Sequence, residues 1–188
     1  MLRDVAARTA VCGGHLRVSA FSGTSAGTAT LFDDELGLVG ATENARFRRI
    51  PDIQDHVVGE VSKKYGDFQG LAGGSDVVGQ FRLADEYVRQ LGQGYVLQEY
   101  VVSDGMQNKA IDIGDASDST EAEAMAHQLV VPDLSGADIL ITGLGNRNGA
   151  KPSSKHAELL VAFYTALCSR MNVAKCLANT EYVSKWGR

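Results

Sequence analysis

The alternation of apolar and polar residues near the start of the chain predicts a strand followed by a glycine-rich loop. The run LRVSAF over residues 16–21 includes Val18 and Phe21, and β-branched and aromatic residues favour strands. The next segment, SGTSAGT, is rich in turn residues and predicts a loop. The run TATLFDDELGL after it fits either a returning strand, which would complete a hairpin, or the start of a helix, because three successive acidic residues are unfavourable in a strand.

Two segments with helical periodicity follow, separated by a glycine loop over residues 66–75. In residues 52–65 apolar side chains recur at every fourth position, which predicts a helix. Residues 76–91 carry a longer apolar stripe, and Ser75 can cap the start of this second helix.

The middle of the chain predicts a hairpin and then a third helix. Residues 95–102 (YVLQEYVV) have the composition of a strand, and the run NKAIDIG after a Ser-Asp-Gly turn suggests a second strand beside it. Thr120 and Glu123 have the spacing of a capping box at the head of a helix, which Pro132 closes.

The clearest strand of the chain is ADILITGLG, residues 137–145. Its nearly continuous apolar run is typical of a strand buried on both faces of a parallel sheet. A helix predicted over residues 153–171 follows, so the last third alternates helix, strand and helix. We therefore expect an α/β fold, a single three-layer domain over residues 1–188 with a mixed or mainly parallel sheet. The alternative is an α+β fold with β-hairpins and a long C-terminal helix.

Composition excludes several classes of protein. The chain has 188 residues, of which 44% are apolar, and this length suits one globular domain. No run approaches the roughly 20 apolar residues of a membrane span, and no secretory apolar run follows the first residues. We expect a cytoplasmic protein with no membrane partner.

The three cysteines, Cys12, Cys168 and Cys176, are odd in number and form no Cys-x-x-Cys pair. Their pattern predicts neither a disulfide framework nor a zinc site. We expect them to be small buried hydrophobic side chains, and we expect no metal or other cofactor.

Charge is distributed unevenly along the chain. The net charge of −5 combines 11 basic and 21 acidic residues over 1–146 with 7 basic and 2 acidic residues over 147–188. The basic C-terminal quarter would attract a phosphate or a polynucleotide. Nucleic acid is the less favoured partner, because no aromatic residues interleave with these basic residues as stacking platforms.

The loop after the strand 137–145 is the first place to look for a ligand, because open parallel sheets bind ligands beyond the carboxyl ends of their strands. Glycines there allow close approach of the backbone to a ligand, polar and basic side chains offer donors to an anion, and serines lie near the N-terminus of the next helix. These candidate binding residues are Gly143, Gly145, Asn146, Arg147, Lys151, Ser153 and Ser154. We expect a small anionic or nucleotide-like ligand.

Glu158 lies near the first turn of that helix, on a side whose later members are small or polar. A carboxylate there could point into a cleft above the sheet edge and act as a nucleophile or general base.

The stretch VVPDLSGADILITGLGNRNGAKPSSKHAELLVAFYTAL resembles the C-terminal part of nucleoside 2-deoxyribosyltransferases and related nucleotide N-glycoside hydrolases. The resemblance covers about a fifth of the chain. It implies an N-glycoside hydrolase or transferase acting on a nucleoside or nucleotide-like substrate. By that resemblance, Glu158 would act at the anomeric carbon, and Asp138, Ser153 and Ser154 would lie around the site.

Two alternative functions come from other features. Residues 23–27, GTSAG, satisfy Gly-x-Ser-x-Gly after a predicted strand, which would make Ser25 the nucleophile of a serine hydrolase. Few prolines, many small residues and a basic C-terminal quarter also suit a self-assembling structural protein such as a viral coat subunit. We expect a homo-oligomer.

Overall fold

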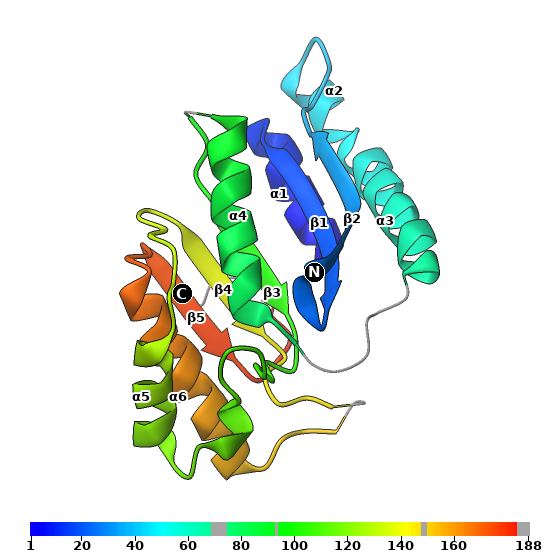
Figure 1. Cartoon of the computed structure of the whole chain (residues 1–188). Helices are drawn as coiled ribbons and strands as arrows, with labels where there is room; N and C mark the ends of the chain where they lie inside the picture. The colour runs from blue at the N-terminus through cyan, green and yellow to red at the C-terminus, as the bar shows by residue number, and fades with distance from the viewer. Residues whose placement is uncertain (69–74, 93, 148–149, 184–188) are drawn as a thin grey trace. The chain divides into compact units, whose positions relative to one another are not determined.

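The computed structural model describes residues 1–68, 75–92, 94–147 and 150–183, except for the side chain of Ser25. The chain forms two compact units, both built from helices and strands (Figure 1), which confirms the α/β class. The first unit contains Met1–Phe21 and Ala26–Leu71, and the second contains Ser22–Ser25 and Ala72–Arg188. The expectation of one domain over residues 1–188 stays a prediction.

The first unit is a β-hairpin with helices packed against it. Its elements are α1 (Leu2–Cys12), β1 (His15–Ser22), β2 (Thr24–Glu35), α2 (Glu43–Phe47) and α3 (Ile50–Asp67), apart from the hairpin residues Ser22–Ser25, which are assigned to the second unit. Helices α1 and α3 pack against each other and share a core with the hairpin. The buried residues of that core are Ala6, Ala10, Leu16, Phe32, Leu36 and Val57. The strand over 16–21 and the helix over 52–65 are confirmed, whereas α1 and α2 were not predicted from the sequence.

The run TATLFDDELGL belongs to a returning strand, so the hairpin is the alternative that the structure supports. The predicted glycine-rich loop is wrong, because β1 and β2 are separated by Gly23 alone. Side chains of β1 contact one of the acidic residues that disfavour a strand here. His15 Nε2 lies 2.7 Å from Asp33 Oδ1, and Arg17 Nε lies 4.0 Å from Asp33 Oδ2.

The second unit contains a three-stranded sheet in which every pairing is parallel. Its elements are α4 (Val77–Leu91), β3 (Gln98–Val102), the 3-10 helix η1 (Ile113–Asp115), α5 (Ser119–Gln128), β4 (Asp138–Thr142), α6 (Ser154–Arg170) and β5 (Lys175–Asn179). The strand order is β3-β4-β5, with Tyr100 opposite Leu140 and Leu140 opposite Leu177. The central strand β4 buries Ile139, Leu140 and Ile141 completely, as its apolar run predicts.

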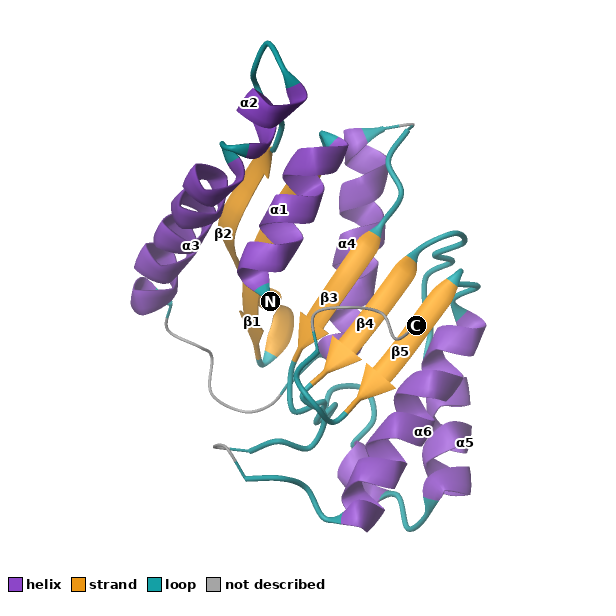
Figure 2. Cartoon of the chain, turned by 180° about the vertical axis from the view of Figure 1, so that it is seen from behind, coloured by secondary structure: helices purple, strands orange, loops and turns teal. Residues whose placement is uncertain are grey.

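The two crossovers of this sheet run in the same direction, from β3 through α5 to β4 and from β4 through α6 to β5. Crossovers of one hand place both of their helices on the same face of the sheet. Helices α5 and α6 accordingly lie side by side and pack against each other (Figure 2). Because all three strands are parallel, their carboxyl ends lie along one edge of the sheet, and the loop between β4 and α6 begins at this edge.

The predicted second strand over 108–114 is wrong. Strand β3 pairs in parallel with β4, and the segment after β3 folds onto the start of α4 instead. The Val78 amide donates to Gln107 Oε1 at 3.1 Å, and the Ser75 amide donates to Asn108 Oδ1 at 3.0 Å. These side chains satisfy backbone donors at a helix start, so the segment is held without forming a sheet ladder.

Two helix starts differ from their predicted caps. Asp76, not Ser75, caps α4 by accepting from the Gly79 amide at 2.9 Å. Asp118 caps α5 by accepting from the Glu121 amide, two residues before the predicted capping box. The helices themselves were predicted correctly, and aspartate is as good an N-cap as serine or threonine.

The expectation for the cysteines is wrong on two counts. Cys168 and Cys176 form a disulfide, and Cys12 is an exposed free cysteine at the end of α1. The disulfide joins the last turn of α6 to the beginning of β5, which was not predicted from the sequence. Because β5 was not predicted either, nothing in the sequence indicated that the chain runs back beside α6 after that helix ends.

Candidate functional site

Three loops meet at the carboxyl edge of the parallel sheet. The Ser103 amide, just after β3, donates to Thr142 O at 3.1 Å, and the Leu144 amide, just after β4, donates to Asn179 O at 3.2 Å. The Gly145 amide donates to Asp104 O at 2.7 Å. The loop after β4 is thus fixed on both sides by its neighbours, and we call this group of loops the carboxyl-edge site.

The two glycines expected to approach a ligand approach the protein instead. A side chain at Gly143 would collide with the ring of Tyr182. A side chain at Gly145 would meet Pro152, with the two Cβ atoms 2.6 Å apart. Both glycines have positive φ, 85° at Gly143 and 76° at Gly145, so each also supplies a backbone conformation that other residues rarely adopt.

The three predicted donors of the loop have partners within the protein. Asn146 Nδ2 donates to the carbonyl oxygen of Thr180. Arg147 Nε lies 3.6 Å from Asp104 Oδ2, and Lys151 Nζ lies 3.0 Å from Glu181 Oε1.

The ion pairs of Arg147 and Lys151 are more exposed to solvent than the contact of the Asn146 side-chain amide with Thr180. The side chain of Arg147 is 61% exposed and that of Lys151 is 79% exposed. Ion pairs in contact with water contribute little stability, typically about 0–1 kcal/mol. These two cations can therefore exchange their carboxylate partners for a stronger anion at low cost.

The serines mark the start of α6. Ser153 is the N-cap, and its Oγ accepts from the His156 amide at 3.3 Å. Ser154 is the first residue of the helix, and both serines are exposed. The helix N-terminus adds a partial positive charge to the end of the loop that carries Arg147 and Lys151.

Asp138 does not belong to this site. It is the first residue of β4, whereas the site follows the last residue of β4, Thr142. Four residues of extended chain separate the two by about 13 Å. Asp138 instead pairs with Lys175 at the beginning of β5, where Nζ lies 3.3 Å from Oδ2.

Glu158 lies on the exposed side of α6. The buried side of this helix includes Leu159, Leu160 and Phe163, and the helical period turns Glu158 away from them. Glu158 lines an open depression on the surface, and none of the other predicted site residues lines it. The residues around that depression are Ser119, Ala157, Glu158, Val161 and Ala162. The expected shared hollow of Glu158 and the anion-binding loop is not formed there.

Ser25 lies within β2, and its side chain is outside the described part of the chain. A nucleophile elbow places its serine at a sharp turn from a strand into a helix. Here the turn is at Gly23, the chain continues as strand to Glu35, and the next helix begins at Glu43. The strand-turn-helix geometry that the motif requires is not formed.

Several residues of the carboxyl-edge site were missed from the sequence. Thr142 is completely buried, its Oγ1 donates to Glu181 O, and it accepts from the Val183 amide at 2.9 Å. One signal was available for it, because Thr142 is the polar residue that interrupts an apolar run. Asp104 also carried a signal, since it is the second residue after a predicted strand. Tyr182 follows β5, which lacks a clear strand pattern.

Tyr164 anchors the loop after β3 through a buried hydrogen bond. Its hydroxyl is completely buried on α6 and donates to Gly105 O at 2.8 Å. Burial, with the nearby carboxylates of Asp104 and Asp76, raises the pKa of Tyr164 above its ordinary value of 10.0. The hydroxyl therefore keeps its proton and remains a donor to the loop.

Within the described residues, no three histidine, cysteine or acidic side chains are grouped closely enough to hold a metal ion. Among the helices described, none has both the length and the apolar character needed to cross a membrane. Comparison of the chain with protein-family models, with curated proteins and with solved structures found no match.

Proposed function

We propose that the second unit binds a small anionic, nucleotide-like ligand at the carboxyl-edge site. The observation that carries this proposal is that Arg147 and Lys151, both exposed, belong to the loop that leads from the carboxyl end of the central strand β4 to the N-terminus of α6. Ligands of open parallel sheets bind at this edge.

The charges at the site favour an exchange of partners. Arg147 and Lys151 each pair with a single carboxylate, that of Asp104 and that of Glu181 respectively. A phosphate group carries more charge than a carboxylate and offers more acceptor oxygens, and the guanidinium fork of arginine matches it in a bidentate manner. The amides at the start of α6 supply further donors.

The binding proposal is tested by calorimetric titration of the full chain with adenosine monophosphate. Arg147→Ala and Lys151→Ala should each weaken binding about tenfold, the usual effect of losing a charge-assisted hydrogen bond. Lys63→Ala, which removes an exposed lysine from α3, is the matched control and should leave the affinity unchanged. Equal affinities for all four proteins would contradict the proposal.

Independently of that binding site, the resemblance implies cleavage or transfer of the N-glycosidic bond of a nucleoside or nucleotide-like substrate at the depression that Glu158 lines, with Glu158 as nucleophile or general base. Its support is the resemblance itself, together with the open depression beside Glu158. Incubation with nucleosides and nucleotides should release free base. A folded Glu158→Gln protein with the activity of the parent would remove Glu158 from the reaction, while leaving the binding proposal in place.

The proposal also covers location and assembly. A nucleotide-like ligand suits a cytoplasmic protein, and we expect a small homo-oligomer. Size-exclusion chromatography with light scattering measures the particle mass directly. Very large particles would instead support the self-assembling coat subunit.

A further inference from the structure

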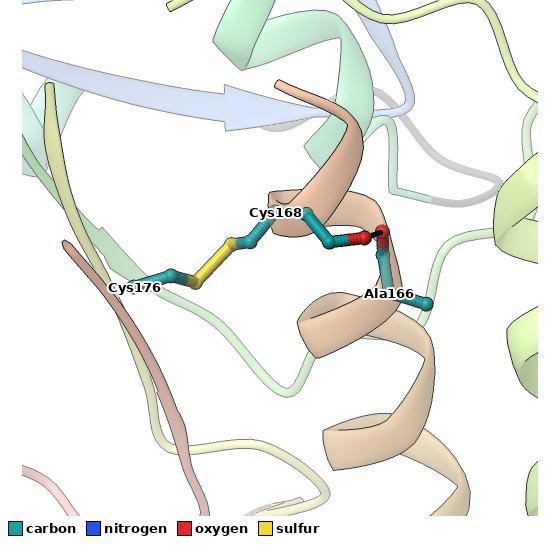
Figure 3. The surroundings of a disulfide bond; sticks show 4 residues. Ala166, Cys168 and Cys176 are labelled. Carbon is teal, nitrogen blue, oxygen red and sulfur yellow. Dashed lines mark hydrogen bonds between the residues drawn. A yellow bond between two sulfur atoms is a disulfide. The ribbon is translucent and has the colours of Figure 1, made fainter. Parts of the chain in front are cut away.

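The Cys168–Cys176 disulfide fastens the beginning of β5 to α6 (Figure 3). Cys168 is buried in the last turn of α6, and Cys176 is the second residue of β5. Their Cα atoms are 6.2 Å apart, within the range that a disulfide spans. The bond closes the short turn over residues 171–174.

The other end of β5 builds the carboxyl-edge site. Residues 180–183 follow the strand and reach three of its parts: Thr180 O accepts from Asn146, Glu181 pairs with Lys151, and Tyr182 occupies the space beside Gly143. The position of this segment depends on β5 staying in the sheet.

Among the described residues, few other polar contacts anchor the beginning of strand β5. The strand lies at an edge of the described sheet, where β4 is its one pairing partner. The amides of Ala174 and Lys175 donate to Ala137 O at 2.8 and 3.3 Å, and Lys175 forms its ion pair with Asp138. The side chain of Lys175 is 64% exposed, so this ion pair is weak. The disulfide is the covalent anchor among the described contacts of this end.

The geometry points to a redox switch, in which the Cys168–Cys176 disulfide keeps β5 in the sheet and thereby assembles the carboxyl-edge site, and its reduction releases the site. This inference rests on the proposed ligand binding only for its functional consequence. Disulfides in a compartment rich in thiols are usually transient and redox-sensing, which agrees with a cytoplasmic protein.

The chemistry is thiol–disulfide exchange with a dithiol reductant. One thiolate of the reductant attacks the sulfur of Cys176, which is partly exposed, and the buried Cys168 leaves as a thiolate and takes up a proton. The second thiol of the reductant then displaces Cys176. The Cys168–Cys176 bond breaks, both cysteines end as thiols, and the reductant is oxidised to its own disulfide.

Hydrogen–deuterium exchange of the full chain tests the structural half of the switch. After reduction with dithiothreitol, amides in residues 143–147 and 175–183 should exchange at least about tenfold faster, whereas those of the central strand β4 stay protected. The Cys168→Ser/Cys176→Ser double variant should behave like the reduced protein without any reductant. Cys12→Ser, which removes the exposed cysteine and keeps the disulfide, should behave like the oxidised parent.

Unchanged exchange in residues 143–147 after reduction would overturn the switch. The functional half is measured by titrating adenosine monophosphate into the oxidised and reduced proteins, where reduction should weaken binding about tenfold and reoxidation should restore it. Equal binding by both forms would also overturn the switch. Binding by neither form would reject the proposed function instead, and the exchange result would then decide the inference by itself.

Discussion

At the scale of single residues, the loop after β3 depends on close contacts between Gly105 and the core. Gly105 has a φ of 74°, and its carbonyl accepts from the buried Tyr164 hydroxyl. A side chain there would collide with Leu144 and would lie 3.0 Å from Cε2 of Tyr164. Both neighbours are completely buried and cannot move aside easily.

Gly105→Ala should therefore lower the free energy of unfolding by about 3 kcal/mol, from backbone strain and overpacking together. Gly136→Ala separates these two causes, because Gly136 has a φ of 84° and nothing lies within 4 Å of its added Cβ. Backbone strain alone should cost about 1 kcal/mol at that position. Urea denaturation of both variants measures the difference, and equal losses would show that the contacts of Gly105 do not matter.

A second effect at the scale of single residues is the raised pKa of Glu99 on β3. Its Oε2 is shielded from solvent and has no hydrogen-bond partner among the described residues. Burial disfavours the charged form and raises the pKa of Glu99 from 4.5 to about 8.

This pKa predicts how stability depends on pH. Between the two pKa values, the folded protein binds one more proton at Glu99 than the unfolded chain does. The free energy of unfolding should therefore fall as the pH rises from 4.5 to about 8, and level off above. One proton gives a slope of at most about 1.4 kcal/mol per pH unit. Urea denaturation across this range should show a shallower slope for Glu99→Gln, and an identical slope in both proteins would argue against a buried Glu99 carboxyl.

At the scale of elements, the sequence predicts those with a complete apolar pattern. Strand β4 has a nearly continuous apolar run, and helices α3, α4 and α6 have long apolar stripes, so their patterns are visible along the chain. Strand β5 (KCLAN) has no clear strand pattern, and β2 contains a stretch of small, turn-favouring residues and an acidic stretch that outweigh its strand pattern. In both cases pairing with another strand decides the structure: β5 pairs with β4, more than thirty residues earlier in the chain, and β2 pairs with β1 across the turn at Gly23. The local pattern of either strand does not contain its partner.

Arg170 makes one such distant contact between α6 and α5. Nη1 of Arg170, in the last turn of α6, donates to Ala126 O at 2.8 Å and to Leu129 O at 2.5 Å. These carbonyls lie at the end of α5, where the helix lacks a following turn of amides to bind them, although Ala126 O also accepts from the Leu129 amide at 3.4 Å.

Arg170→Ala should lower the free energy of unfolding by about 1.5–3 kcal/mol, since it leaves carbonyls without a charged donor. Arg89→Ala is the matched control, because Arg89 forms an exposed i,i+4 pair with Asp85 on α4. Such pairs contribute about 0.3–0.5 kcal/mol. Thermal denaturation should rank the two variants accordingly, and a loss for Arg170→Ala no greater than that of the control would refute the role of the contact.

At the scale of the whole molecule, much of the basic C-terminal quarter is engaged within the second unit. Arg147, Lys151 and Lys175 pair with carboxylates, and Arg170 binds the end of α5. The charge asymmetry in the sequence thus corresponds to contacts among parts of one unit. Its sign could be predicted from the sequence, but its partners could not, because two of them, Asp104 and Asp138, lie more than thirty residues away along the chain.

The candidate site was predicted in part for the same reason. The loop after β4 could be placed at a sheet edge, since an apolar strand and a helix flank it. Glu158 was expected at that edge from the order of residues along α6, and the helical period places it on the exposed side instead. The segment after β5 was missed together with its strand.

The most direct test is to map the ligand on the protein. Titration of the isotope-labelled full chain with adenosine monophosphate, followed by amide chemical shifts, reports each loop separately. The account predicts that the shifts concentrate in residues 143–147, 150–153 and 180–183 and disappear in the Arg147→Ala/Lys151→Ala double variant. Shifts that concentrate around Glu158 or in the first unit, or that persist in the double variant, would contradict a ligand site at the carboxyl edge of β3, β4 and β5.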